Sequence, residues 1–161
     1  MMKQFFWLID GELAGGDQCL LQSPQCERLS ELGVKAILSF CGLTAQQCAA
    51  LSATHIEWHG ATLSLAGFPD VAPTDELLNG LTDALKRLHQ WRTAGKPALV
   101  CCPSGNELTS ALLACYLTQT GAAPVHAVSQ VRALNADAFS LPGWDQGVFD
   151  LIYALPEIAL D

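Results

Sequence analysis

The segment LVCCPSGNELTS, residues 99–110, joins an apolar run to a glycine-containing turn and then to residues with helical character. We expect a buried strand at residues 98–102 that ends at Cys102, followed by a helix over residues 109–120. In open α/β sheets, ligands bind beyond the carboxyl ends of the strands, where helices begin. The intervening turn can direct successive backbone N–H groups inward, and the helix N-terminus adds a positive field that favours a thiolate. The segment therefore predicts an anion site beside a thiol.

The rest of the chain alternates apolar runs with helical patterns. Further strands are expected at residues 5–9, 34–40 and 55–65, and further helices at residues 23–32, 44–53, 75–94, 124–134 and 146–155. The helix over residues 75–94 is the clearest, because Thr74 caps it and its leucines follow the helical period. Strands that alternate with helices predict an α/β fold with a central, mainly parallel sheet flanked by helices. We expect one compact domain over residues 1–161.

Composition and charge exclude several classes of function. Half of the 161 residues are hydrophobic, which is ample for a core, and the formal net charge is −8. Nucleic acids and anionic membranes attract clustered cations, so neither is an expected partner. No apolar run approaches the length of about 20 residues that spans a bilayer, and the N-terminus does not fit a secretory signal. The odd number of cysteines, seven, favours free thiols and a cytoplasmic location.

The pattern Cys102-x-x-Gly105-x-x-x-Thr109 resembles the signature of the cysteine-dependent protein phosphatases, especially the compact dual-specificity and tyrosine phosphatase-like group. The resemblance extends along most of the chain. Residues 7–15 (WLIDGELAG) are similar to the N-terminal strand and turn of that family, and residues 32–38 (LGVKAIL) to its next helix-to-strand step. Phe68-Pro69-Asp70 resembles the general-acid loop, and Arg132 and Gln146 stand where the family often has an arginine and a glutamine.

The resemblance implies hydrolysis of a phosphomonoester without a metal or other cofactor. Cys102 would attack phosphorus and form a phosphocysteine, Asp70 would protonate the leaving oxygen, and the hydroxyl of Thr109 would support the thiolate. The ligand would be a phosphorylated protein or a small phosphate or other oxyanion. The oligomeric state is left open. The anion-binding loop that the resemblance implies consists of Ser104, Gly105, Asn106, Glu107 and Leu108.

Two departures from the family pattern bear on activity. Leu108 stands at the position of the family's arginine, which binds two phosphate oxygens, and Cys101 stands where a histidine usually precedes the nucleophile. In addition, Glu107 brings a negative charge to the loop. Loss of one well-placed charge-stabilising group commonly lowers a rate by about 10²–10³. We therefore expect this phosphatase-like protein to be catalytically weak or inactive.

Three alternative interpretations follow from the same residues. The protein could be a pseudophosphatase that serves as a binding or regulatory module. It could be a thiol redox protein that uses Cys102, although neighbouring strand residues point to opposite faces, so Cys101 is expected in the core. The last is a metal site, suggested by the spacing of Cys41, Cys48, His55 and His59, but this spacing is wider than that of common zinc motifs. We expect no metal.

Overall fold

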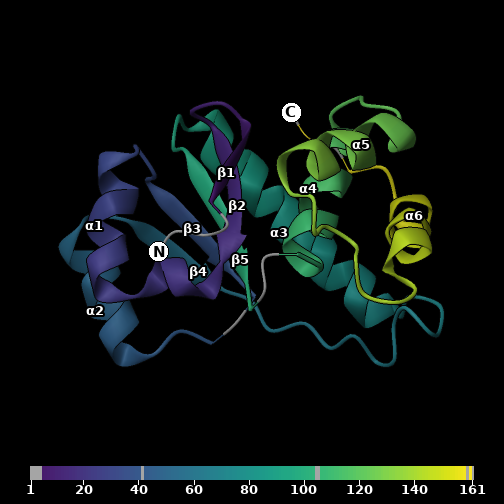
Figure 1. Ribbon diagram of the computed structural model, residues 1–161, viewed down its shortest axis with the longest axis horizontal. Coiled ribbons are helices and arrows are strands. Elements are labelled where there is room, and N and C mark those ends of the chain that lie inside the picture. Colours follow the sequence, from purple (N-terminus) through teal and green to yellow (C-terminus); the bar gives the residue numbers. More distant parts are fainter. Residues whose placement is uncertain (1–4, 41, 104–105, 159, 161) are drawn as a thin grey trace.

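The computed structural model describes residues 5–40, 42–103, 106–158 and 160, in which helices cover both faces of a central sheet (Figure 1). The strands are β1 (Phe6–Ile9), β2 (Leu13–Asp17), β3 (Ala36–Ser39), β4 (Glu57–Gly60) and β5 (Ala98–Cys102). The helices are the 3₁₀ helix η1 (Gln18–Leu21), α1 (Ser23–Glu31), α2 (Ala45–Ala53), α3 (Asp75–Thr93), α4 (Leu108–Gln119), α5 (Pro124–Leu134) and α6 (Trp144–Ala154).

The sheet has the order β1-β2-β5-β3-β4, and all of its neighbouring strands run parallel except β1 and β2. This arrangement confirms the predicted α/β fold with a mainly parallel central sheet. The strand β5 lies in the middle, and every one of its residues is buried. Its last residue, Cys102, is paired with Asp17 of β2. The thiol therefore stands at the carboxyl edge of the central strand, as expected for a ligand site.

The two faces of the sheet carry separate hydrophobic clusters. Val100 and Cys102 belong to the larger cluster, which contains the apolar faces of α3, α4, α5 and α6. Leu99 and Cys101 belong to the smaller cluster with residues of α1 and α2. Figure 1 shows the same division, with α1 and α2 on one side of the sheet and α3 to α6 on the other. The alternation along β5 therefore directs the two adjacent cysteines to opposite faces, as the sequence predicts.

Two elements differ from the sequence expectation. The strand expected over residues 55–65 is confined to Glu57–Gly60, and an irregular segment with only isolated turns leads from it to α3. The residues LAGGD form β2, although their two glycines favour a turn when the sequence is considered alone. Pairing with both β1 and β5 satisfies the backbone of this segment and overrides its low strand propensity.

Gly15 in β2 allows a close approach of the core. A methyl group at this position would lie 2.7 Å from Cζ of Phe6 and 2.8 Å from Cδ1 of Leu113, distances that real side chains do not adopt. Leu113 is fully buried in α4 and Phe6 is 9% exposed, so neither side chain has room to move freely. Gly15 therefore determines how closely α4 packs on the sheet.

We predict that Gly15→Ala lowers the free energy of unfolding by about 1–3 kcal/mol, because it overpacks a filled core. Gly60→Ala is the matched control, since Gly60 also lies in a strand but has no atom within 4 Å of the added methyl group. Urea unfolding of both variants measures the difference. Equal stability of the two variants would contradict the packing role of Gly15.

Candidate functional site

The candidate site begins where β5 ends and α4 starts. Cys102 is 2% exposed, and Glu107 precedes the first residue of α4, with its carbonyl accepting the hydrogen bond from the N–H of Ala111 at 2.8 Å. Thr109, in the first turn of α4, is fully buried, and its hydroxyl oxygen has no hydrogen-bond partner in the described structure. Ser104 and Gly105, which complete the expected anion-binding loop, lie outside the described residues.

A cavity of about 230 Å³ opens at Cys102. We call it the Cys102 cavity, and the described residues that line it are Leu65, Cys102, Pro103, Glu107, Leu108, Leu141 and Trp144. No lysine, arginine or histidine is among these described lining residues. The side chain of Leu108 therefore forms part of the wall of a largely apolar cavity, at the position where the family signature has its arginine.

Glu107 is the only described carboxyl group on the wall of the Cys102 cavity. It is 9% exposed, and its oxygen Oε2 is buried without a hydrogen-bond partner in the described structure. Burial raises the pKa of Glu107, because removal from water disfavours the charged form. The structure thus places this acid on the wall of the cavity that Cys102 also lines.

Asn135 fixes the end of the loop, and sequence reasoning did not identify it. Its side-chain amide donates to Oδ1 of Asn106 at 3.1 Å and lies 3.5 Å from Oγ of Ser110 in α4. The N–H of Phe139 also donates to the carbonyl of Asn106 at 3.3 Å. An asparagine directly after a helix indicates only that the helix ends, so nothing in the local sequence points to this tertiary contact.

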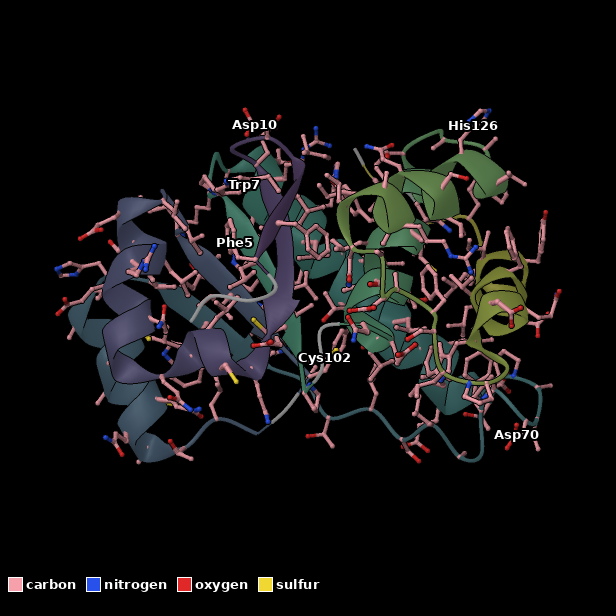
Figure 2. The ribbon with its side chains drawn as sticks, viewed as in Figure 1. Phe5, Trp7, Asp10, Asp70, Cys102 and His126 are labelled. Atoms are coloured by element: carbon pink, nitrogen blue, oxygen red, sulfur yellow. The ribbon has the colours of Figure 1, made fainter. Side chains whose placement is uncertain are left out.

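Asp70 lies apart from Cys102. Figure 2 shows the two residues in different regions of the molecule, with Asp70 at the outer end of the loop that precedes α3. Asp70 is exposed and lines a separate open cavity of about 570 Å³, together with Asp150 and Tyr153 of α6. The structure therefore does not bring the expected general acid to the expected nucleophile.

Arg132 and Gln146 also lie away from the Cys102 cavity. The guanidinium group of Arg132 is stacked over the ring of Phe139, 5.5 Å from its centroid. The side-chain amide of Gln146 donates to Asp150 at 3.1 Å, one helical turn further along α6. Neither residue is among those that line the Cys102 cavity, so neither replaces the missing arginine there.

The residues whose spacing suggested a metal site lie on different elements of the structure. His55 lies in a turn before β4, His59 lies on β4, and Cys48 lies on α2, while Cys41 falls outside the described residues. Among the described residues, no group of three or more His, Cys, Asp or Glu side chains could hold a metal ion. For the redox interpretation, Cys101 is fully buried on the face of β5 opposite to Cys102, which does not favour a reactive pair.

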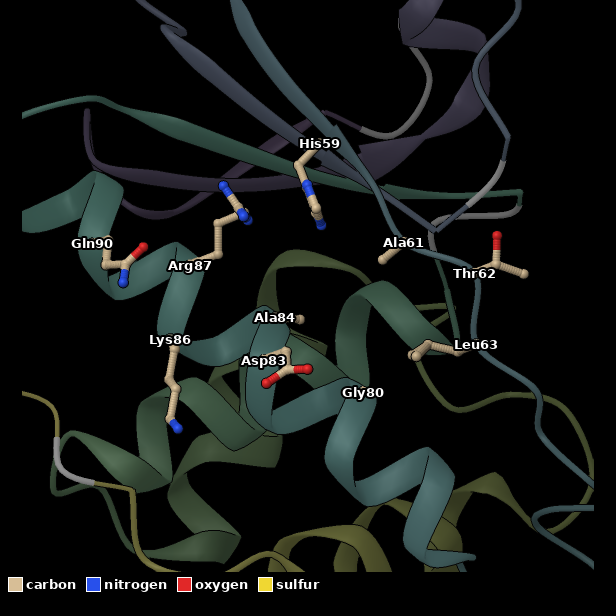
Figure 3. Close-up of a pocket in the computed structure, with 10 residues that line it drawn as sticks. All are labelled: His59, Ala61, Thr62, Leu63, Gly80, Asp83, Ala84, Lys86, Arg87 and Gln90. Atoms are coloured by element: carbon tan, nitrogen blue, oxygen red, sulfur yellow. The ribbon is translucent and has the colours of Figure 1, made fainter.

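His59 instead lines a second cavity, of about 490 Å³, between β4 and α3. Figure 3 shows His59 pointing into this cavity and Arg87 of α3 reaching toward β4, whereas the side chain of Lys86, which also lines the cavity, points away from His59. Burial and the positive charge of Arg87 lower the pKa of His59. This second cavity shares no described lining residue with the Cys102 cavity.

Comparisons with known proteins support the fold. No protein-family model matches the chain, and no curated protein matches it in sequence. Among solved structures, the phosphatase Tk-PTP in its active form superposes with a TM-score of 0.73 at 14% identity, over 96% of this chain and 100% of that one. The core catalytic domain of the PP-IP phosphatase SIW14 from S. cerevisiae, in complex with citrate, gives a TM-score of 0.71 at 17% identity, over 97% of this chain and 87% of that one.

A third similar structure is named as a phosphatase-like interacting protein and not as a phosphatase. The human tyrosine phosphatase-like serine/threonine/tyrosine-interacting protein has a TM-score of 0.70 at 14% identity and covers 94% of this chain and 98% of that one. These similarities show that the chain has the fold of the tyrosine and dual-specificity phosphatases, which confirms the resemblance at the level of the fold. At such identities, activity has to be argued from the site itself.

We predict that Glu107→Gln gains stability relative to wild type as the pH rises. Because the pKa of Glu107 is raised in the folded state, the native protein holds this proton over a range in which the unfolded chain has lost it. The stabilisation from this group is complete below the unfolded pKa and is lost as the pH rises through the folded pKa. Urea unfolding from about pH 4 to about pH 8 measures the difference between the variants. Glu27→Gln, on the exposed surface of α1, should show no such trend.

We also predict that Arg87→Gln raises the pKa of His59, because it removes the nearby positive charge that disfavours the imidazolium. An NMR titration of the His59 ring measures the shift. Lys86→Gln removes the same charge from a side chain that points away from His59 and should leave the titration unchanged. Equal shifts in both variants would mean that only the general charge of the protein acts on His59.

Proposed function

We propose that this chain is a phosphatase-fold binding or regulatory module, in which hydrolysis of phosphomonoesters through Cys102 is weak or absent. One observation carries the proposal: Leu108 and the buried Glu107 form the wall of the Cys102 cavity where the family signature has a phosphate-binding arginine. The scaffold, the thiol and the hydroxyl of Thr109 are retained. The cation that stabilises the transferred phosphoryl group is absent from the described lining residues.

The electrostatic argument has two parts. A guanidinium group binds two phosphate oxygens and neutralises charge that develops in the transition state, and a leucine side chain does neither. A phosphate dianion in the Cys102 cavity would in addition lie near the Glu107 carboxyl group and oppose its ionisation. Both effects lower the affinity for the substrate and the rate of the chemical step. We therefore expect phosphorylated proteins, small phosphates and other oxyanions to bind weakly at the Cys102 cavity.

Any remaining hydrolysis would proceed through a phosphocysteine. The Sγ atom of Cys102 would form the bond to phosphorus as the ester P–O bond breaks, and the leaving oxygen would take a proton from an acid. Asp70 is the acid that the resemblance implies, but it would have to approach from a separate cavity. The separation of the two residues adds a second reason for slow turnover.

The proposal retains the cytoplasmic location expected from the abundance of cysteines. The six cysteines within the described residues are thiols and not disulfides. No helix in the described part of the chain is both long and apolar enough to cross a membrane. Of these thiols, Cys102 is the one that lines the cavity at the end of β5, whereas burial raises the pKa of Cys115 to about 12 and keeps that thiol protonated.

We predict that the wild-type protein hydrolyses p-nitrophenyl phosphate at a rate close to that of Cys102→Ser, and that an arginine introduced at residue 108 raises turnover. Leu108→Arg should gain about 10²- to 10³-fold over wild type, the range commonly associated with one charge-stabilising group. The gain should be larger in the double variant Glu107→Gln with Leu108→Arg, because the new guanidinium then has no carboxylate beside it to pair with.

Steady-state rates of the four proteins, together with release of inorganic phosphate, measure these effects. The Cys102→Ser substitution added to Leu108→Arg is the matched control, and it should abolish the restored turnover. Wild-type turnover that disappears in Cys102→Ser and equals or exceeds that of Leu108→Arg would overturn the proposed weak or inactive module. Absence of turnover in both arginine variants would show that the separation of Asp70 from Cys102, and not the missing cation alone, prevents catalysis.

A further inference from the structure

The wall of the Cys102 cavity carries the carboxyl group of Glu107, one oxygen of which has no hydrogen-bond partner among the described residues. Glu107 is 9% exposed, and this oxygen is buried. A buried carboxylate without a partner is unfavourable, and burial accordingly raises the pKa of this group. A cationic group inside the cavity would neutralise the charge of the Glu107 carboxylate and favour its ionised form.

The described lysine and arginine side chains of this chain lie outside the Cys102 cavity, and several of them have other partners. Arg92 pairs with Glu12, and Lys96 pairs with Glu57. Arg132 is stacked on Phe139. None of the described lysines or arginines lines the Cys102 cavity. A cation that pairs with Glu107 would therefore come from outside the described residues.

The size and lining of the cavity restrict what that cation can be. Its volume of about 230 Å³ is below the range of about 300–1,000 Å³ found for most small-molecule sites, so the cavity suits a group of about the size of one side chain. Leu65, Leu108 and Leu141 present apolar walls, which suit an alkyl stem. The indole ring of Trp144 lines the same cavity, and aromatic rings attract ammonium groups.

We propose that the Cys102 cavity binds a primary ammonium group on a short alkyl chain, with Glu107 as the ion-pair partner. The ammonium is carried either by a lysine side chain of a partner protein or by a free alkylamine. The inference rests on the proposed loss of phosphate hydrolysis at the same site. Replacement of arginine by Leu108, together with the buried acid Glu107, reverses the charge preference of the cavity from anion to cation. The net charge of −8 favours the approach of cations in the same direction.

The test is an NMR titration of the whole chain with three probes, n-butylamine, n-butanol and inorganic phosphate. The indole N–H of Trp144 and the methyl groups of Leu108 report on the cavity. We expect saturable shifts with n-butylamine, and binding of n-butanol at least about tenfold weaker, since a charged hydrogen bond contributes more than a neutral one. Tighter binding of phosphate than of n-butylamine, or equal binding of n-butanol and n-butylamine, would overturn the proposal.

Two variants test whether the Glu107 carboxylate is the ion-pair partner of the ammonium group. Glu107→Gln should weaken the binding of n-butylamine about tenfold to hundredfold, whereas Glu27→Gln on the exposed surface of α1 should leave it unchanged. Leu141 is 54% exposed at the cavity, so Leu141→Lys is expected to fold normally and to compete with n-butylamine through a tethered ammonium. Unchanged affinity in both Glu107→Gln and Leu141→Lys would overturn the proposal.

Two further arms distinguish the source of the ammonium. A tripeptide with a central lysine and blocked ends is compared with the same peptide acetylated at Nζ. Binding of the unmodified peptide alone supports a lysine side chain of a partner protein, and binding of n-butylamine without either peptide supports a free amine. Phosphatase rates measured on the same samples separate the two proposals. Wild-type turnover through Cys102 as fast as that of Leu108→Arg contradicts the proposed function, while loss of amine binding contradicts only this inference.

Discussion

The structure depends on the burial of β5 between β2 and β3. All residues of this strand are buried, its backbone is paired on both sides, and its side chains alternate between the two hydrophobic clusters. This packing determines where the strand ends and which face its last side chain takes. Cys102 consequently lies beside the start of α4, on the face covered by α3 to α6. The candidate site exists because the central strand leaves the thiol at this edge.

The same packing gives the site its apolar character. The helix α4 is buried along most of its length, and its first turn carries Leu108 and the fully buried Thr109. Asn135 and Phe139 hold Asn106 just before this helix, so the end of the loop has a defined position. Glu107 is thereby retained at the cavity wall, although burial is unfavourable for its charge. A site of this composition differs from a phosphate-binding site in charge, because no described lysine, arginine or histidine lines it.

Much of the fold could be predicted from the sequence, and the site only in part. The strand at residues 98–102 and the helix over residues 75–94 were predicted because their apolar periodicity is a local property. The strand β2 was missed because LAGGD acquires its conformation from pairing with β1 and β5. The role of Asn135 was missed for a similar reason, since its contacts join residues 29 positions apart. The position of Asp70 depends on a loop that no periodic pattern describes, and that of the Arg132 side chain depends on its tertiary contact with Phe139.

The sequence by itself determined the class of fold, the place of Cys102 at a strand end, and the substitution of leucine for the expected arginine at residue 108. These properties follow from residue identity and from local periodicity. Only the tertiary structure decided that Glu107 is buried on the cavity wall, that Asp70 is apart from Cys102, and that Arg132 does not replace the missing cation. The physical reason is that burial and charge pairing depend on which distant segments pack against a residue, and a linear pattern does not specify those neighbours.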